Sequence, residues 1–212
     1  MIHMPMKYPF GSVGSIVLTG FEQSLQGTVA RCVAAKVIQH DGHIVCLVEH
    51  ERTGRETLGA MTDLLRGLET DLQVLDRLHV IDNVNEYQTA ETLAAAIKAK
   101  VETPTLIIRD ASHYMLPLNT EQWLPISDEL ALTLDVPVLT ATHHGPSGPP
   151  APNYSKIEAD EVWTATAGLN LALTLKRWKP RTEVVRLRGR VLHNGGQYLF
   201  ENETVQELGH AH

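Results

Sequence analysis

The sequence contains little cysteine and few aromatic residues. Of its 212 residues, two are cysteines and 5% are aromatic. Cys32 and Cys46 fall in apolar segments, which favours small core residues in a reducing compartment over a disulfide. No apolar run approaches the roughly 18 residues that a membrane-spanning helix needs, and the first residues carry no secretion signal. We therefore expect a cytoplasmic protein without a membrane partner.

Basic residues are also fewer than acidic ones, 18 against 25, and the formal net charge is −7. Such a chain has no overall attraction for nucleic acid, so any binding to DNA must use a local basic patch. A hydrophobic content of 43% in 212 residues suits one well-filled globular domain. We expect residues 1–212 to form a single domain.

Apolar runs of strand length alternate with segments of helical periodicity along most of the chain. This alternation predicts an α/β fold, a three-layer αβα sandwich with a mainly parallel sheet. The C-terminal part predicts successive strands instead, and thus a β-rich end. The predicted helices span residues 26–39, 53–68, 89–101 and 120–134. The predicted strands span residues 16–18, 43–49, 78–81, 105–108, 137–141, 162–166, 169–175, 183–187 and 197–200.

Three segments lack this periodicity. Residues 1–14, rich in Pro and Gly, are expected to be an extended segment before the first strand. Residues 145–156, rich in Pro, Gly and Ser, predict a flexible loop, and residues 208–212 a solvated tail.

The first predicted strand, a glycine-opened loop and a helix together have the layout of a phosphate-binding loop. Backbone N–H groups and a helix N-terminus can cradle phosphate there. In a working loop, G-x-x-x-x-G-K-[ST], the lysine reaches the terminal phosphates and the hydroxyl holds Mg²⁺. Counted from Gly20, Leu25 takes the second glycine position, Gln26 the lysine position and Gly27 the hydroxyl position. With one inserted residue, Gly27 takes the second glycine position and Thr28 the lysine position, so neither register supplies a lysine.

Polar residues follow several predicted strands, where α/β sheets bind their ligands. Glu49 is a candidate base for an attacking water, and Asp110 a candidate Mg²⁺ ligand acting through water. His143 and His144 are candidates for contact with a terminal phosphate or with DNA phosphate. Each of these residues also has a structural alternative as an ordinary polar strand end.

The densest positive cluster, residues 176–181, falls between two predicted strands, and we expect an exposed turn. Its basic residues could reach a phosphate of a neighbouring subunit's nucleotide or of single-stranded DNA, with Trp178 as a stacking surface. A solvated hairpin with a packed tryptophan is the structural alternative. The candidate residues are Lys176, Arg177, Lys179 and Arg181.

In this order the segments resemble the RecA-type ATPase core of replicative hexameric helicases, especially the plasmid RepA-like helicase ATPases. The resemblance implies that Glu49, Asp110 and His143 are catalytic, with Asp110 also serving the metal, and that ATP and Mg²⁺ are the cofactors. It implies a nucleotide site at Gly20, Gln26, Gly27 and Thr28. His144 and the basic cluster would then contact phosphate in trans or on DNA. The segments that carry it are residues 14–20, 45–49, 79–83, 89–93, 106–110, 136–144 and 159–163.

Three functions follow from this. The first is a RecA/RepA-like protein of DNA replication, recombination or plasmid and phage maintenance, with impaired or lost ATP hydrolysis because the loop lysine is missing. It would form homo-oligomers or assemble with a related RecA-like subunit. The second is an active ATPase or helicase-type motor with a non-standard phosphate loop. The third is an unrelated α/β enzyme that uses Glu49, Asp110 and His143. The sequence does not decide whether the protein is an enzyme.

Overall fold

The computed structural model describes residues 14–20, 25–50, 52–82, 89–111, 120–142, 157–167, 172–191 and 198–202. The structural account below concerns these residues. Several sequence predictions lie outside them: the extended segment up to residue 13, the loop 145–156, the tail 208–212, and the two candidate histidines, His143 and His144.

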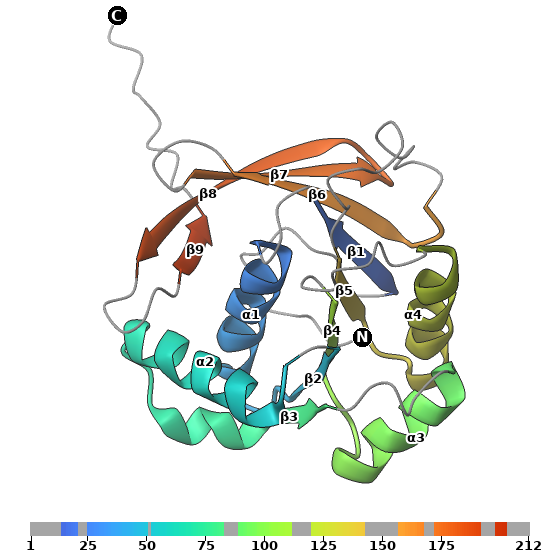
Figure 1. The fold of residues 1–212 in the computed structure, drawn as a ribbon, viewed down its shortest axis with the longest axis horizontal. Helices are drawn as coiled ribbons and strands as arrows, with labels where there is room; N and C mark the ends of the chain where they lie inside the picture. The colour runs from blue at the N-terminus through green and yellow to red at the C-terminus, as the bar shows by residue number, and fades with distance from the viewer. Residues whose placement is uncertain are drawn as a thin grey trace, which may run out of the picture.

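Nine strands of the described residues form one sheet in the order β3-β2-β4-β5-β1-β6-β7-β8-β9 (Figure 1). The strands from β3 to β6 pair in parallel. The pairs β6–β7, β7–β8 and β8–β9 are antiparallel. The strand bounds are β1 Ser15–Thr19, β2 Val45–Glu49, β3 Leu78–Ile81, β4 Leu106–Ala111, β5 Val138–Thr142, β6 Glu161–Ala167, β7 Ala172–Lys179, β8 Glu183–Val191 and β9 Tyr198–Asn202.

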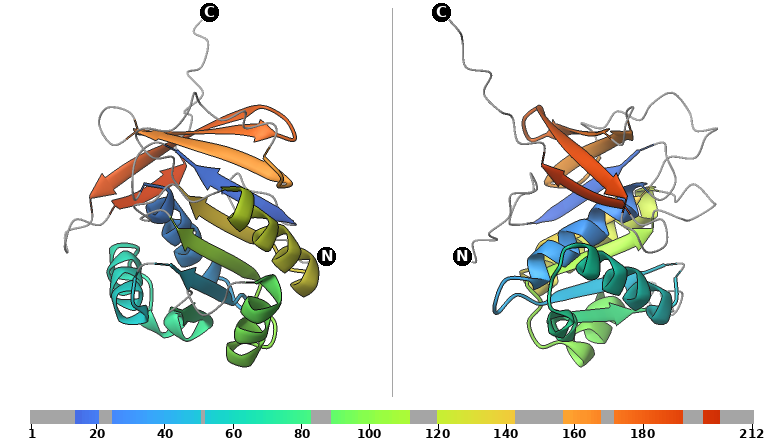
Figure 2. Two further views of the ribbon diagram at one scale, coloured as in Figure 1. Left: turned by 45° about the vertical axis from the view of Figure 1, so that its right-hand side comes forward. Right: turned by 90° about the vertical axis from the view of Figure 1, so that its left-hand side faces the viewer.

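Helices cover both faces of the parallel part, as Figures 1 and 2 show. Helices α1 (Leu25–Ile38) and α2 (Gly54–Gly67) pack on one face, in a core that also holds Trp163. Helices α3 (Ala90–Lys100) and α4 (Thr120–Leu134) pack on the other. The predicted three-layer αβα sandwich with a mainly parallel sheet and a β-rich C-terminal end is therefore confirmed. None of these helices is long and apolar enough to cross a bilayer.

Helix boundaries follow the capping residues in the sequence. Thr53 precedes α2, and its hydroxyl accepts a hydrogen bond from the Glu56 backbone N–H while the Glu56 side chain accepts one from the Thr53 backbone N–H. This is the predicted capping box. The expected left-handed turn after α1 is also present, because Gly42 has φ of 76°.

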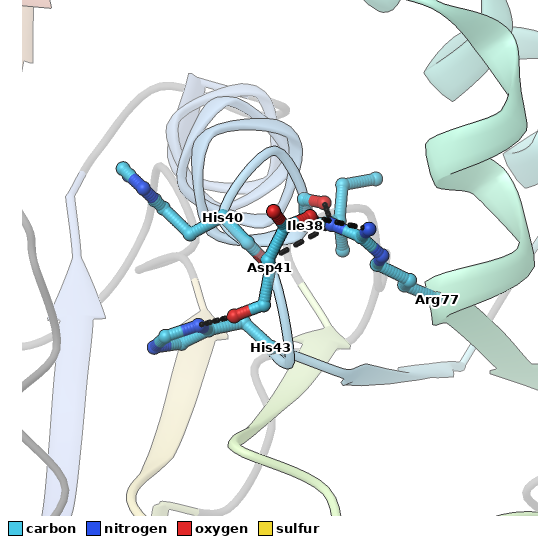
Figure 3. Close-up of polar contacts among 5 residues, drawn as sticks. All are labelled: Ile38, His40, Asp41, His43 and Arg77. Atoms are coloured by element: carbon cyan, nitrogen blue, oxygen red, sulfur yellow. Dashed lines mark hydrogen bonds and ion pairs between the residues drawn. The ribbon is translucent and has the colours of Figure 1, made fainter.

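The C-terminus of α1 is held by Arg77, which closes a short 3₁₀ helix, η1 (Leu72–Arg77), that the sequence analysis did not predict. Figure 3 shows its guanidinium donating to the carbonyl oxygens of Ile38 and His40, each at 3.1 Å, and pairing with the Asp41 carboxylate at 2.7 Å. A cation at this end also suits the helix dipole. Arg77 thus fixes the end of α1 farther from the candidate site.

Two boundary predictions were wrong. The predicted strand 105–108 extends to Ala111, so Asp110 lies within β4 and not after it. The predicted turn 176–181 is also displaced, because Lys176 to Lys179 belong to β7 and only residues 180–182 connect β7 to β8. Long charged side chains with a Trp fit a half-exposed strand as well as a turn, and cross-strand pairing with β6 and β8 decides between them.

Candidate functional site

The two candidate carboxylates lie side by side at the carboxyl ends of two central strands. Glu49 of β2 and Asp110 of β4 are partners in the parallel register, and their exposed fractions are 2% and 3%. Neighbouring strands run about 4.8 Å apart, so the sheet itself sets the separation of these residues. Two adjacent buried carboxylates repel each other unless protons or cations compensate them.

The cation beside Asp110 is an arginine of the same chain. Arg31 lies in α1, and its Nη1 is 2.7 Å from Oδ2 of Asp110, with side-chain exposures of 5% and 1%. Its Nη2 is 3.5 Å from Oγ1 of Thr28, one helical turn earlier. The sequence analysis missed Arg31. The signal that could have found it is a charged residue within the apolar run Val29-Ala30-Arg31-Cys32-Val33, whose members are all buried.

Glu49 sits in surroundings that favour its protonated form. Its pKa is raised from 4.5 to about 7, first by burial and then by the negative charge of Asp110. A hydrogen bond of 2.9 Å from the Thr57 hydroxyl opposes this shift, as do the charges of Arg31 and Arg52. Near neutral pH, Glu49 can therefore both hold and release a proton.

His50 and Arg109 flank the carboxylates. Burial, followed by the charge of Arg109, lowers the pKa of His50 from 6.5 to about 3, so the imidazole is neutral at ordinary pH. Arg109 donates from Nη1 to the Ser127 hydroxyl at 2.5 Å, and that hydroxyl lies 2.7 Å from the Thr140 hydroxyl. Burial lowers the pKa of Arg109 to about 10. This group ties β4 and β5 to α4 behind the carboxylates.

The candidate phosphate loop is described at both ends but not at residues 21–24. Gln26, in the first turn of α1, has an exposure of 0%, and among the described residues neither its Oε1 nor its Nε2 has a hydrogen-bond partner. A Cβ added to Gly20 would lie 2.3 Å from Nε2 of Gln26 and 2.6 Å from the Ala165 carbonyl oxygen. The Gln26 amide therefore folds back against Gly20, at the position where the loop counting expects a lysine. Gly27 is buried beside it and Thr28 is half-buried.

The basic cluster does not form one patch. The register between β6 and β7 shifts here, pairing Val162 with Lys179 and Trp163 with Arg177. The Arg177 guanidinium lies 5.3 Å from the centre of the buried Trp163 ring, whereas Lys176 Nζ lies 3.5 Å from the centre of the Trp178 ring. These cations therefore already have aromatic neighbours within the chain.

The other side chains of this segment also make contacts within the chain. The Trp178 indole donates to the Thr164 hydroxyl at 3.0 Å. Arg177 pairs with Glu183, and Lys179 donates to the Ala159 carbonyl oxygen at 2.6 Å. Arg181 is exposed. The candidate cluster thus divides into cations engaged by the fold and one at the surface.

The basic cluster and the carboxylates lie in different parts of the sheet. Strands β5, β1 and β6 separate β7 from β4. The basic residues of β7 therefore do not join Asp110 within one chain. Any joint action on one phosphate would require a second subunit.

A divalent metal does not fit the described residues as they stand. Asp110, the candidate ligand, already pairs with Arg31. In the part of the chain that the structure describes, no group of three His, Cys, Asp or Glu side chains could hold a metal ion. The third function considered from the sequence also needs His143, which lies outside that part.

Comparison with solved structures identifies the fold. A solved helicase ATPase domain superposes with a TM-score of 0.62 at 13% sequence identity, covering 92% of this chain and 86% of that one. The RadB recombinase superposes with a TM-score of 0.57 at 11% identity, covering 84% and 89%. No protein-family model matches the chain, and neither does any curated protein sequence. The chain therefore has a RecA-like fold.

Proposed function

We propose that this chain is a RecA-fold subunit with impaired or lost ATP hydrolysis that acts in DNA replication, recombination or plasmid and phage maintenance. Its role would be that of a scaffold, loader or regulator, as a homo-oligomer or beside a related RecA-like subunit. The fold and the nature of the two similar structures, an ATPase domain and a recombinase, support the cellular setting. Residual binding of ATP through backbone N–H groups is compatible with this role.

The observation that carries the proposal is the buried Gln26 amide against Gly20. An ammonium at this position would give charge-assisted hydrogen bonds to the terminal phosphates, which a neutral amide cannot replace. Losing one such contact to the transition state typically slows a reaction by about a hundredfold or more. A subunit with Gln26 at this place is expected to hydrolyse ATP slowly or not at all.

Steady-state ATPase measurement tests this proposal directly. We expect turnover far below about 1 s⁻¹, the lower range of working enzymes. Asp110→Asn, purified in parallel, controls for contaminating ATPases. Wild-type turnover at or above that rate, abolished in the Asp110→Asn protein, would contradict the proposal.

Glu49 favours a second function, an active ATPase with a non-standard loop. A general base works best when its pKa is near the operating pH, and the pKa of Glu49 is about 7. In this case Glu49→Gln should abolish turnover while leaving binding of a non-hydrolysable ATP analogue unchanged by calorimetry. If neither wild type nor variant turns over ATP, the first function stands.

Binding to single-stranded DNA is tested at Lys176 and Arg181 of the basic cluster. Charge reversal of both should weaken binding and make its salt dependence shallower, because fewer counterions are released. The matched control reverses Arg55 and Lys98, two exposed cations on α2 and α3. Equal losses in both double variants would assign the binding to overall charge. Sedimentation of the same variants tests the oligomer.

A further inference from the structure

The Arg31 guanidinium lies where a RecA-like nucleotide site would place its divalent cation. In working sites, Mg²⁺ is held between a hydroxyl in the first turn of the helix after the loop and a carboxylate at the end of a neighbouring strand. Here Thr28 and Asp110 supply these two groups. Arg31 bridges them, with Nη1 at 2.7 Å from Asp110 and Nη2 at 3.5 Å from Thr28.

This cation is permanent. A guanidinium stays protonated at any physiological pH, and both partners of the Arg31–Asp110 pair are almost fully buried. Mg²⁺ needs direct oxygen contacts at about 2.0–2.1 Å in a near-octahedral shell. To reach Asp110, a metal ion would have to displace Arg31 and leave a buried charge uncompensated, which is strongly unfavourable.

The charges around the pair already balance. The surroundings of Glu49 contain the negative charge of Asp110 and the positive charges of Arg31 and Arg52. Arg52 likewise lies close enough to Arg31, Asp110 and Glu49 for their charges to act on it. Two carboxyl groups thus face two guanidinium groups. An added divalent cation would create an excess of positive charge in a buried region.

We propose that Arg31 is the resident cation of this site and replaces the divalent metal, so that Asp110 binds no Mg²⁺ or related ion. The inference rests on the proposed function only in treating the site as a former nucleotide site. Removal of the guanidinium should then create a metal site, since Asp110 and Glu49 would remain as adjacent buried carboxylates beside the Thr28 hydroxyl.

The test measures metal binding without nucleotide. Mn²⁺ is titrated by electron paramagnetic resonance into wild type, Arg31→Met, Asp110→Asn and the double variant. We expect no saturable site in wild type, and a site in Arg31→Met at least about tenfold tighter, or about 1.4 kcal/mol. The double variant should lose it. Arg66→Met is the matched control, because it removes an arginine from an exposed pair with Asp63.

Thermal unfolding keeps the test decisive if Arg31→Met folds poorly. An ion that binds only the folded state raises the unfolding temperature with concentration. Mn²⁺ should therefore stabilise Arg31→Met and leave wild type and Arg66→Met unchanged.

Two results would overturn the inference. One is saturable Mn²⁺ binding to wild type that Asp110→Asn removes. The other is failure of Mn²⁺ to bind or stabilise Arg31→Met. Neither result depends on hydrolysis, so the proposed function is judged separately.

Discussion

Arg31 Nη1 lies 2.7 Å from Asp110 Oδ2, in an ion pair that joins α1 to the central strand β4. The same helix carries the Gln26 amide that packs against Gly20. One helix therefore brings both an amide and a guanidinium to the edge of the sheet where a RecA-like site would hold phosphate and metal. The stability and pH dependence of the fold should report on this arrangement.

Removal of one partner of the Arg31–Asp110 pair should be strongly destabilising. Asp110→Asn or Arg31→Met leaves a buried charge uncompensated, and we expect a loss of about 3–5 kcal/mol in the free energy of unfolding. The double variant should lose less than the sum of the two. Arg66→Met, at an exposed pair, should cost about 1 kcal/mol or less. Urea denaturation measures all four; additive losses would show that the pair is not coupled.

Glu49 should make the protein less stable as pH rises. Between the unfolded pKa of 4.5 and the folded pKa of about 7, the folded state holds a proton that the unfolded state has released. The contribution is fully present below pH 4.5 and is lost toward pH 7, by up to about 1.4 kcal/mol per pH unit. Glu49→Gln should remove this pH dependence. Urea midpoints measured across this range check it, and identical pH profiles for wild type and variant would contradict it.

His50 should act in the opposite direction. Its folded pKa of about 3 lies below the unfolded value of 6.5, so the unfolded state binds the additional proton between these values. Stability from His50 is thus present above pH 6.5 and lost as pH falls. Between pH 4.5 and 6.5 the two contributions oppose each other.

Variants at the two positions separate these contributions. On acidification from pH 6.5 to 4.5, His50→Gln should lose less stability than wild type, because its side chain takes up no proton. Glu49→Gln should lose more stability than wild type over the same range. Urea midpoints at both pH values measure the changes, and changes of the same sign in both variants would refute the assignment.

Gly20 should tolerate no side chain. Gly20→Ala places a Cβ 2.3 Å from Gln26 Nε2 and 2.6 Å from the Ala165 carbonyl oxygen, and backbone cannot move aside cheaply. We expect a loss of about 1–3 kcal/mol, as for other overpacked sites. Gln26→Ala in the same protein should restore only part of it, because the clash with the carbonyl oxygen remains.

The control for this substitution is Gly59→Ala. The added Cβ meets nothing within 4 Å on α2, and the helix should gain up to about 1 kcal/mol. Chemical denaturation of these variants measures the differences. Equal stability of Gly20→Ala and wild type would show that the loop relaxes around the methyl group.

Local sequence signals were sufficient for the fold. Period and capping predicted the order of helices and strands, including the Thr53–Glu56 capping box, because these features depend on residues close in sequence. The displaced turn at residues 176–181 depended on pairing with distant strands, which the cluster itself does not encode. Elements were thus predicted well where the signal was local.

The site was predicted only in part. The strand ends pointed to Glu49 and Asp110, and parallel register places them together. Arg31 could not be paired with Asp110 from the sequence, because 79 residues separate them and the contact arises from packing of α1 on the sheet. The position of the Gln26 amide against Gly20 likewise depends on side-chain packing. The roles of the predicted residues remain predictions.

The pairing of β2 with β4 has a consequence for engineering. Glu49 and Asp110 face each other through consecutive hydrogen-bonded rungs that begin at Val45 and Leu106. Their spacing is therefore built into the backbone ladder, and no redesign of a surface loop can widen or narrow it. A lysine installed at position 26 would meet an acidic pair whose geometry is already set, which makes Gln26→Lys with Arg31→Met the shortest route for asking whether this scaffold can be returned to phosphate chemistry.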